Sequence, residues 1–228
     1  MAPSTSAFSS RQMAEEIVSM SLSLEELARA AFIDAIQEFS ENPELIRIIR
    51  EIGEGNYLSV TPELVARIEA LPIQTTDLQK ILNQAFSASA VISLMSTEIN
   101  ISFDIWNPRA VEYLRQLGVD ISSLSGSISE NIKDILDKAI SGGLTTTEVR
   151  MLLKRQVGLL PQHADAVDRY FDSLINQGIG IRKARKLADE YAERLLDYRA
   201  NLIARTEIGR AVGFGQWELW QQMLDKNL

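Results

Sequence analysis

The sequence has no cysteine and a single histidine, His163. Disulfides, thiolate metal sites and cysteine nucleophiles are therefore excluded. With one imidazole, a single chain completes neither a pair of histidine ligands nor a Ser-His-Asp triad. This inventory disfavours an enzyme, and we expect no catalytic residue, no metal and no cofactor.

Long apolar runs are also missing. The most apolar internal stretch, residues 85–95, is shorter than the ~18–20 residues that a membrane span needs. The N-terminal MAPSTSAFSS has no basic start followed by an apolar core, so it does not read as a signal peptide. We expect a protein without a membrane partner, made in the cytoplasm, with one or two globular domains.

Charge is distributed unevenly along the 228 residues, which carry a net charge of −8. Residues 1–147 hold 10 basic and 20 acidic side chains, whereas residues 148–210 hold 12 basic and 9 acidic ones. An acidic surface repels nucleic acid, so any DNA contact is expected in the second half of the chain.

Helix start signals are dense. Proline stands directly after a capping residue at Asn42-Pro43 and Thr61-Pro62. The spacing of a capping box occurs at Ser23 with Glu26, Ser127 with Glu130 and Thr145 with Glu148. The longest periodic run covers residues 181–224. The pattern predicts an all-α protein, an elongated helical bundle with a long C-terminal helix.

Residues 99–105 depart from the helical pattern. Ile99, Ile101, Phe103 and Ile105 alternate with polar residues, a period of two that indicates a short strand or an extended segment. Such a segment either adds to the sheet edge of a partner or crosses a helical face, and we favour the second interpretation. At most one short strand is expected.

The composition divides the chain into four parts. We predict a flexible arm over residues 1–10, an N-terminal acidic helical region over 11–121, a serine-rich linker over 122–129 and a C-terminal helical region over 130–228.

Two charged clusters are candidate sites. Asp165, Asp168 and Asp172 share one helical face, where a hard cation could bind, although acids near a helix start also suit the helix dipole and face water. The second is the basic cluster, which consists of Arg182, Lys183, Arg185 and Lys186. Positive charge at a helix start opposes the dipole. DNA-backbone contact explains it; a solvated face balanced by nearby acids is the alternative.

The long helix carries a heptad pattern. Its seam follows Ala184, Ala188, Tyr191, Leu195, Tyr198 and Leu202, spacings made for packing along another helix. Arg205 takes the next seam position, so we predict that it is buried against a carboxylate or a helix C-terminus. Glu207 lies about 200° around the helix from Arg205 and requires a separate contact, within the core or at a subunit interface.

Small and aromatic residues follow. Gly209 and Gly213 lie on one side of the helix and allow another backbone to approach closely, while Phe214, Trp217 and Trp220 place large rings near the chain end. We predict that these five residues form an interface. The alternative is that residues 12–100 fold back and cover them.

Residues 199–207, Arg-Ala-Asn-Leu-Ile-Ala-Arg-Thr-Glu, followed by Ala211 and Gly215, resemble the signature of the phage Mu protein F-like family of minor head proteins. The order of the preceding segments is similar too, so the resemblance covers about residues 103–222. A departure is Gly213, where the family often has asparagine. The residues that match the signature are Arg199, Ala204, Arg205, Thr206, Glu207 and Gly215.

The resemblance implies a structural minor head (minor capsid) protein of a tailed bacteriophage, acting in head assembly at or near the portal. Expected partners are the portal protein, other copies of the chain, other head proteins and phage DNA, bound without sequence specificity. The expected location is the interior of the virion head, after assembly in the host cytoplasm. The alternative from the basic cluster is a cytoplasmic helical DNA-binding regulator.

Overall fold

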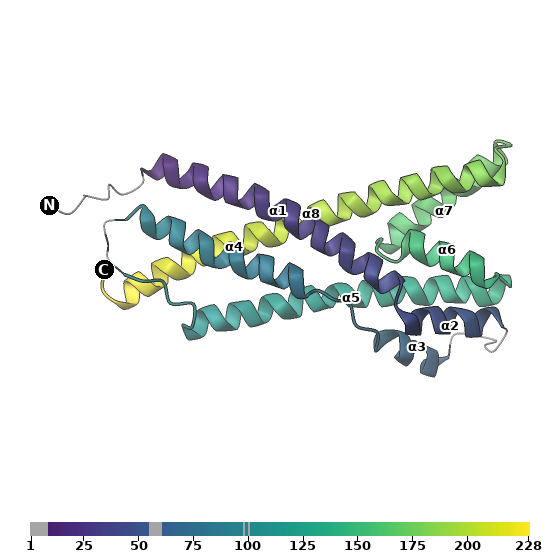
Figure 1. Ribbon diagram of the computed structural model, residues 1–228, viewed down its shortest axis with the longest axis horizontal. Helices are drawn as coiled ribbons and strands as arrows, with labels where there is room; N and C mark the ends of the chain where they lie inside the picture. The colour runs from purple at the N-terminus through teal and green to yellow at the C-terminus, as the bar shows by residue number, and fades with distance from the viewer. Residues whose placement is uncertain (1–8, 55–60, 98, 100) are drawn as a thin grey trace. The chain divides into compact units, whose positions relative to one another are not determined.

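The computed structural model describes residues 9–54, 61–97, 99 and 101–228 and contains no strand within them. Its helices are α1 (Ser10–Ser40), α2 (Pro43–Gly53), α3 (Pro62–Glu69), α4 (Thr76–Met95), α5 (Pro108–Gly142), α6 (Thr146–Gln156), α7 (Pro161–Asn176) and α8 (Ile181–Asp225) (Figure 1). The prediction of an all-α protein with a long C-terminal helix is confirmed. Most of the predicted flexible arm lies outside the described residues.

Several helices begin at the capping residues that the sequence indicates. The Asn42 side chain accepts hydrogen bonds from the backbone of Glu44 and Leu45 at the start of α2. At the start of α6, Thr145 and Glu148 form the complete reciprocal capping box. These side chains satisfy backbone N–H groups that have no partner inside the helix, so the local sequence fixes where the helices start.

One expected helix start, at Ser23, and the predicted linker with the expected start at Ser127 lie inside longer helices instead. Ser23 is in the middle of α1, where its hydroxyl donates to the carbonyl oxygen of Ser19. Residues 122–129, predicted as a linker, belong to α5, so that prediction was wrong. Ile128 is buried, and its burial outweighs the weak helix propensity of the serines and glycine around it.

The chain forms two compact units, neither of which is a continuous segment. Unit 1 consists of residues 1–31, 76–120 and 201–228, and unit 2 consists of residues 32–75 and 121–200. Three of the four boundaries fall within α1, α5 and α8, and the fourth falls at the start of α4. The predicted division into regions 11–121 and 130–228 does not match the units.

In unit 1, α4 lies along the last part of α8 (Figure 1). The hydroxyl of Ser89 donates to the carbonyl oxygen of Val212 at 3.0 Å, and the side chain of Gln216 donates to Ser93 at 3.2 Å. The start of α5 contacts the same part of α8, because the rings of Tyr113 and Phe214 stack with their centroids 3.9 Å apart.

The alternating segment belongs to unit 1, and none of its described residues is in a helix or a strand. Ile99, Ile101 and Phe103 pack against a buried cluster that includes Leu219. The backbone N–H and carbonyl of Asp104 bond to the side-chain amide of Gln222 at 2.8 Å each. The segment thus crosses a helical face, which agrees with the second interpretation, and its polar backbone is satisfied by a side chain.

Unit 2 is held together by apolar packing and by a few buried or partly buried polar contacts. Arg67 of α3 bonds to Glu44 and Glu51 of α2 at 2.8 and 2.7 Å. The amide of Asn131, which is buried in α5, donates to the carbonyl oxygens of Gln156 and Leu159 and ties α5 to the turn after α6. Each of these contacts joins segments that are distant in the sequence.

Candidate functional site

The residues that resemble the family signature all lie on α8, but they face different surroundings. Ala204 is buried, whereas Arg205 and Thr206 are exposed. Glu207 is half-buried and pairs with Arg210 on the same helix, with an N–O distance of 3.1 Å. The prediction that Arg205 is buried was wrong, and the signature presents it to solvent instead.

Arg199 is the buried arginine of α8. Its side chain is in the core of unit 2, where Nη1 donates to the carbonyl oxygen of Gly158 at 2.7 Å. The guanidinium also lies over the ring of Phe32, 5.8 Å from the ring centroid. Burial lowers the pKa of Arg199, because the charged form loses hydration. The resemblance includes this residue, but periodicity assigned the buried role to Arg205.

The reason for that error is visible in the spacing of the buried residues on α8. Ala184, Ala188 and Ala192 are each four residues apart, and Ala200, Ala204 and Ile208 continue the same spacing. Four residues turn a helix by about 400°, so the buried face rotates by about 40° at every step. A heptad seam rotates much less. The predicted seam therefore leaves the core after Leu195, and Tyr198 and Leu202 are exposed.

Gly215 allows α4 and α8 to approach one another closely in unit 1. A Cβ atom at this position would overlap the carbonyl oxygen of Phe86 and the hydroxyl of Ser89. By contrast, no atom lies within 4 Å of a Cβ placed at Gly209 or Gly213. The close backbone approach that we expected at Gly209 and Gly213 is found at Gly215, against α4 of the same chain. Gly209 and Gly213 face open space instead.

The aromatic residues near the chain end divide into two groups. Phe214 is half-buried, because it stacks on Tyr113 and lies near Phe86, with ring centroids 6.2 Å apart. Trp217 and Trp220 remain 44% and 49% exposed. Of the predicted interface residues, Phe214 is therefore part of the core of unit 1, and both tryptophans have free surface.

Seven exposed and uncharged positions of α8 in unit 1 lie along one face of the helix, which we call the exposed stripe; the exposed side chains of Arg205 and Arg210 flank it. Its members are Leu202, Thr206, Gly209, Gly213, Trp217, Trp220 and Leu224. They recur at spacings of three and four residues, so they occupy an arc about 80° wide. None of them is charged. A continuous uncharged face with two exposed tryptophans is typical of a protein contact.

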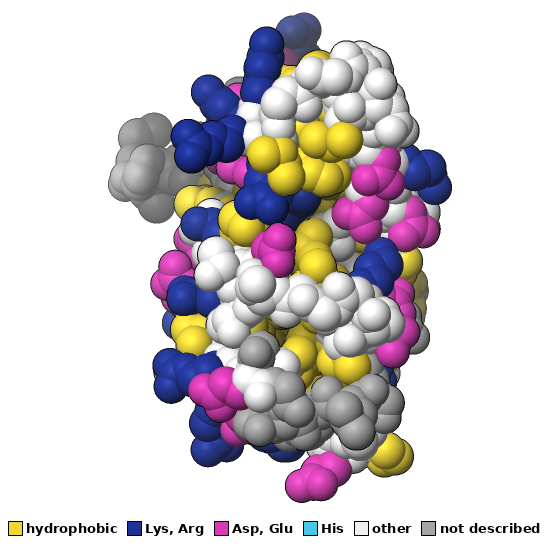
Figure 2. All heavy atoms as spheres, turned by 90° about the vertical axis from the view of Figure 1, so that its right-hand side faces the viewer, with side chains coloured by type: hydrophobic (Ala, Val, Ile, Leu, Met, Phe, Trp, Pro, Cys, Tyr) yellow, Lys and Arg dark blue, Asp and Glu magenta, His cyan; other side chains and the backbone are white. Residues whose placement is uncertain are grey.

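The basic cluster begins α8 in unit 2. Arg182 and Lys183 are exposed, Arg185 lies 3.6 Å from Glu148, and Lys186 lies 3.8 Å from Glu190. Acids therefore partly neutralise the cluster. Figure 2 likewise shows acidic and basic side chains intermixed over one face of the protein.

The three aspartates at the start of α7 do not form a cation site. Asp168 bonds to Lys138 at 3.2 Å and also accepts from Gln156, while Asp165 lies 4.0 Å from Lys138. Across the described residues, no group of three or more His, Cys, Asp or Glu side chains is arranged to hold a metal ion. Nor does any described helix have the length and apolarity to cross a membrane.

A buried glutamate on α8 was missed by the sequence reasoning. The side chain of Glu218 is fully buried in unit 1, 3.1 Å from Arg109 Nε, and accepts from Gln222 at 3.0 Å. Arg109 also pairs with Asp225 at 2.7 Å, and hydrogen bonds to Asp225 and Glu218 raise its pKa. Arg109 follows Pro108 at the start of α5, and local sequence gives no signal for a contact more than 100 residues away.

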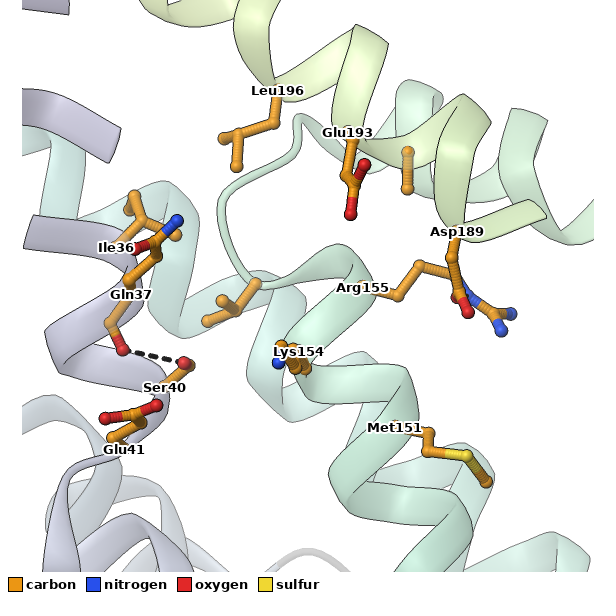
Figure 3. A pocket seen from close by; sticks show the side chains of 12 residues that line it. Ile36, Gln37, Ser40, Glu41, Met151, Lys154, Arg155, Asp189, Glu193 and Leu196 are labelled. Carbon is orange, nitrogen blue, oxygen red and sulfur yellow. Dashed lines mark hydrogen bonds and ion pairs between the residues drawn. The ribbon is translucent and has the colours of Figure 1, made fainter. Parts of the chain in front are cut away.

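Unit 2 contains a pocket of about 450 Å³ between parts of α1, α6 and α8. Figure 3 shows Gln37 and Glu41 on one side, Lys154 between the two sides, and Glu193 and Asp189 opposite, with the Arg155 side chain extending to Asp189. Arg155 is paired with Asp189 at 2.7 Å. Acids and bases line this pocket together around apolar side chains, and the arrangement holds no recognisable nucleophile with its base.

Comparisons with protein-family models, curated proteins and solved structures found no match to this chain. The likeness to minor head proteins therefore depends on the residue pattern alone.

Proposed function

We propose that this chain is a minor head protein of a tailed bacteriophage that contributes to head assembly at or near the portal. Two independent features support the proposal. One is the residue pattern of about 103–222, with its Ala-Arg-Thr-Glu core at residues 204–207. The other is the surface of the helix that carries this core.

The exposed stripe is the observation that carries the proposal. Catalysis requires converging polar groups, whereas assembly requires apolar surface that a partner can cover. The stripe offers Trp217 and Trp220, the residue type most enriched among the energetically dominant positions of protein interfaces. It begins within the signature and continues to the end of α8. This placement supports a role for the signature helix in contacting other head components, the portal first among them.

The experiment is a portal-binding and head-incorporation assay with the double variant Trp217→Ser and Trp220→Ser. Both side chains are about half exposed, so we expect the variant to fold with an unchanged circular dichroism spectrum. We expect it to lose co-sedimentation with the purified portal and to be missing from phage heads.

A matched control removes equivalent apolar surface from another helix. Val18→Ser with Leu22→Ser takes two exposed side chains from α1, which are 57% and 61% exposed. The control is expected to bind the portal normally. If the tryptophan variant folds and still enters heads, the stripe is not the contact surface; if the wild-type chain ignores the portal, the proposal itself is wrong.

A further inference from the structure

The pocket of about 450 Å³ in unit 2, which we call the unit 2 pocket, has walls from α1, α6 and α8. Two of its apolar lining residues, Ile36 of α1 and Leu196 of α8, pack closely on Gly158. A Cβ atom at Gly158 would lie 2.6 Å from Leu196 Cδ1 and 2.8 Å from Ile36 Cγ2. Met151 of α6 adds a third apolar side chain to the lining. The volume is within the range of about 300–1,000 Å³ that small-molecule sites occupy.

Polar contacts hold α6 and α8 together beside this pocket. Arg155 Nε lies 2.7 Å from Asp189 Oδ1, and the Arg155 guanidinium lies over the ring of Phe171, 5.9 Å from its centroid. In the turn after α6, the carbonyl oxygen of Gly158 accepts from Arg199 Nη1 at 2.7 Å. The walls are therefore fixed by contacts within unit 2, so a ligand has little side-chain ordering to impose when it binds.

The unpaired charge of the lining is mainly negative. Arg155 and Asp189 offset one another. Within the described part of the chain, the side chains of Glu41, Glu193 and Lys154 form no ion pair, which leaves two carboxylates against one ammonium. Figure 3 shows the Glu193 carboxylate pointing away from α8 into the space between the helices, with Glu41 on the opposite side.

Two helix ends add to this negative potential. Helix α1 ends at Ser40 and α6 ends at Gln156, and residues from the last turn of each helix line the pocket. The C-terminal end of a helix carries the equivalent of about −0.5 elementary charge. Helix α8 contributes residues between 189 and 196, which lie beyond its first turn, so its positive end does not offset the other two.

We propose that the unit 2 pocket binds a small organic cation, which is an ammonium or guanidinium group on an aliphatic stem. The cationic group pairs with Glu193, and the stem lies against Ile36, Met151 and Leu196. An aliphatic stem is favoured because the apolar lining consists of alanine, valine, isoleucine, leucine and methionine side chains. Apolar walls with a few charged groups are the usual composition of a ligand site. Lys154 repels the cation and limits its affinity.

The test is a titration of the full chain with n-hexylamine, followed by NMR of ¹³C-labelled methionine methyl groups. The chain has 6 methionines, so each signal reports one position. We expect the Met151 signal, identified by its loss in Met151→Leu, to shift, whereas Met223, which is buried in unit 1, should not respond. For so small a ligand we expect a Kd of about a millimolar. Hexanol and hexanoate have the same stem without the positive charge and should bind several-fold more weakly.

Three variants test the charges one at a time. Glu193→Gln should raise the Kd of hexylamine about threefold, the effect of losing one exposed ion pair, and Lys154→Gln should lower it by a similar factor because a like charge is removed. Glu38→Gln makes the same charge change as Glu193→Gln at an exposed position of α1 outside the pocket lining, so it is the matched control and should bind like wild type. All three side chains are exposed, so we expect unchanged circular dichroism spectra.

A blocked lysine, Nα-acetyl-lysine methylamide, distinguishes the two sources of such a cation. Binding as tight as that of hexylamine assigns the pocket to a lysine side chain of a partner protein, and binding of hexylamine alone assigns it to a free amine. A Met151 signal that hexylamine leaves unmoved at several times the expected Kd overturns the proposal. So does equal binding of hexanol or hexanoate, or a folded Glu193→Gln variant with wild-type affinity. The proposal goes beyond contact with the portal and does not rest on it, because the exposed stripe belongs to unit 1.

Discussion

Replacing each of the two arginines of the signature with alanine tests the packing of α8 directly. Arg199→Ala removes a buried guanidinium that donates to the carbonyl oxygen of Gly158, and Arg205→Ala removes an exposed one. The sequence periodicity assigns the larger effect to Arg205, and the structure assigns it to Arg199.

The magnitude follows from the contacts of Arg199. A hydrogen bond from a charged donor contributes about 1.5–3 kcal/mol, and a cation over a ring contributes about 0.5–1 kcal/mol. The unsatisfied Gly158 carbonyl and the missing packing of the aliphatic stem add to the cost, while relief of the guanidinium's desolvation opposes it. We expect Arg199→Ala to lower the free energy of unfolding by about 3 kcal/mol and Arg205→Ala to change it by less than about 0.5 kcal/mol.

Thermal and urea unfolding followed by circular dichroism measure both changes. For a chain of this size, about 3 kcal/mol corresponds to a decrease in Tm of roughly 6–12 °C. Arg199→Met keeps the stem and isolates the polar contact, so it should destabilise the protein less than Arg199→Ala. Equal destabilisation by Arg199→Ala and Arg205→Ala, or a larger effect of Arg205→Ala, would refute the assignment of the buried face of α8.

Three further predictions concern other parts of the chain. Gly215→Ala should destabilise unit 1 by about 1–3 kcal/mol, the usual cost of overpacking, because its methyl group would overlap the Phe86 carbonyl. Gly209→Ala should stabilise the helix, because its methyl group meets open space. Denaturant unfolding that ranks the two variants in the opposite order would contradict both expectations. Hydrogen bonds from Arg47 and then Arg67 lower the pKa of Glu44. The contribution of Glu44 to the free energy of unfolding is therefore present above pH ~4.5 and is lost as the pH falls below that value. Glu44→Gln should flatten the acid limb of a curve of stability against pH, and an unchanged limb would disprove this role of Glu44. If the basic cluster contacts DNA phosphates, changing its four residues to alanine should lower the affinity for DNA and reduce the salt slope by about 0.9 for each phosphate that the variant no longer neutralises, whereas unchanged binding would remove the DNA role.

Local features of the sequence were sufficient for the starts of α2, α3 and α6. The caps at Asn42, Thr61 and Thr145 act on backbone groups two or three residues away, so the information is contained in a few neighbouring positions. The linker prediction failed because composition was weighed above spacing. Serine and glycine lower helix propensity only modestly, and apolar residues at helical spacing kept α5 intact.

The candidate site was predicted in part. The sequence placed Trp217, Trp220, Gly209 and Gly213 at an interface, and their exposure and open surroundings are compatible with that prediction. It also included Phe214, whose contacts with Phe86 and Tyr113 come from distant segments of unit 1.

What the sequence determined by itself is therefore the helical class of the protein and the starts of its capped helices. Hydrogen bonds within a helix join residues four apart, so periodicity and caps are enough to define it. Only the tertiary structure decided which face of α8 is covered. That face rotates with the four-residue spacing of its alanines, and its partners arrive from α4 and α5 more than 100 residues earlier. This packing turns Arg199 inward and leaves Arg205 and the exposed stripe facing solvent, because a helix has no buried side until other segments cover it.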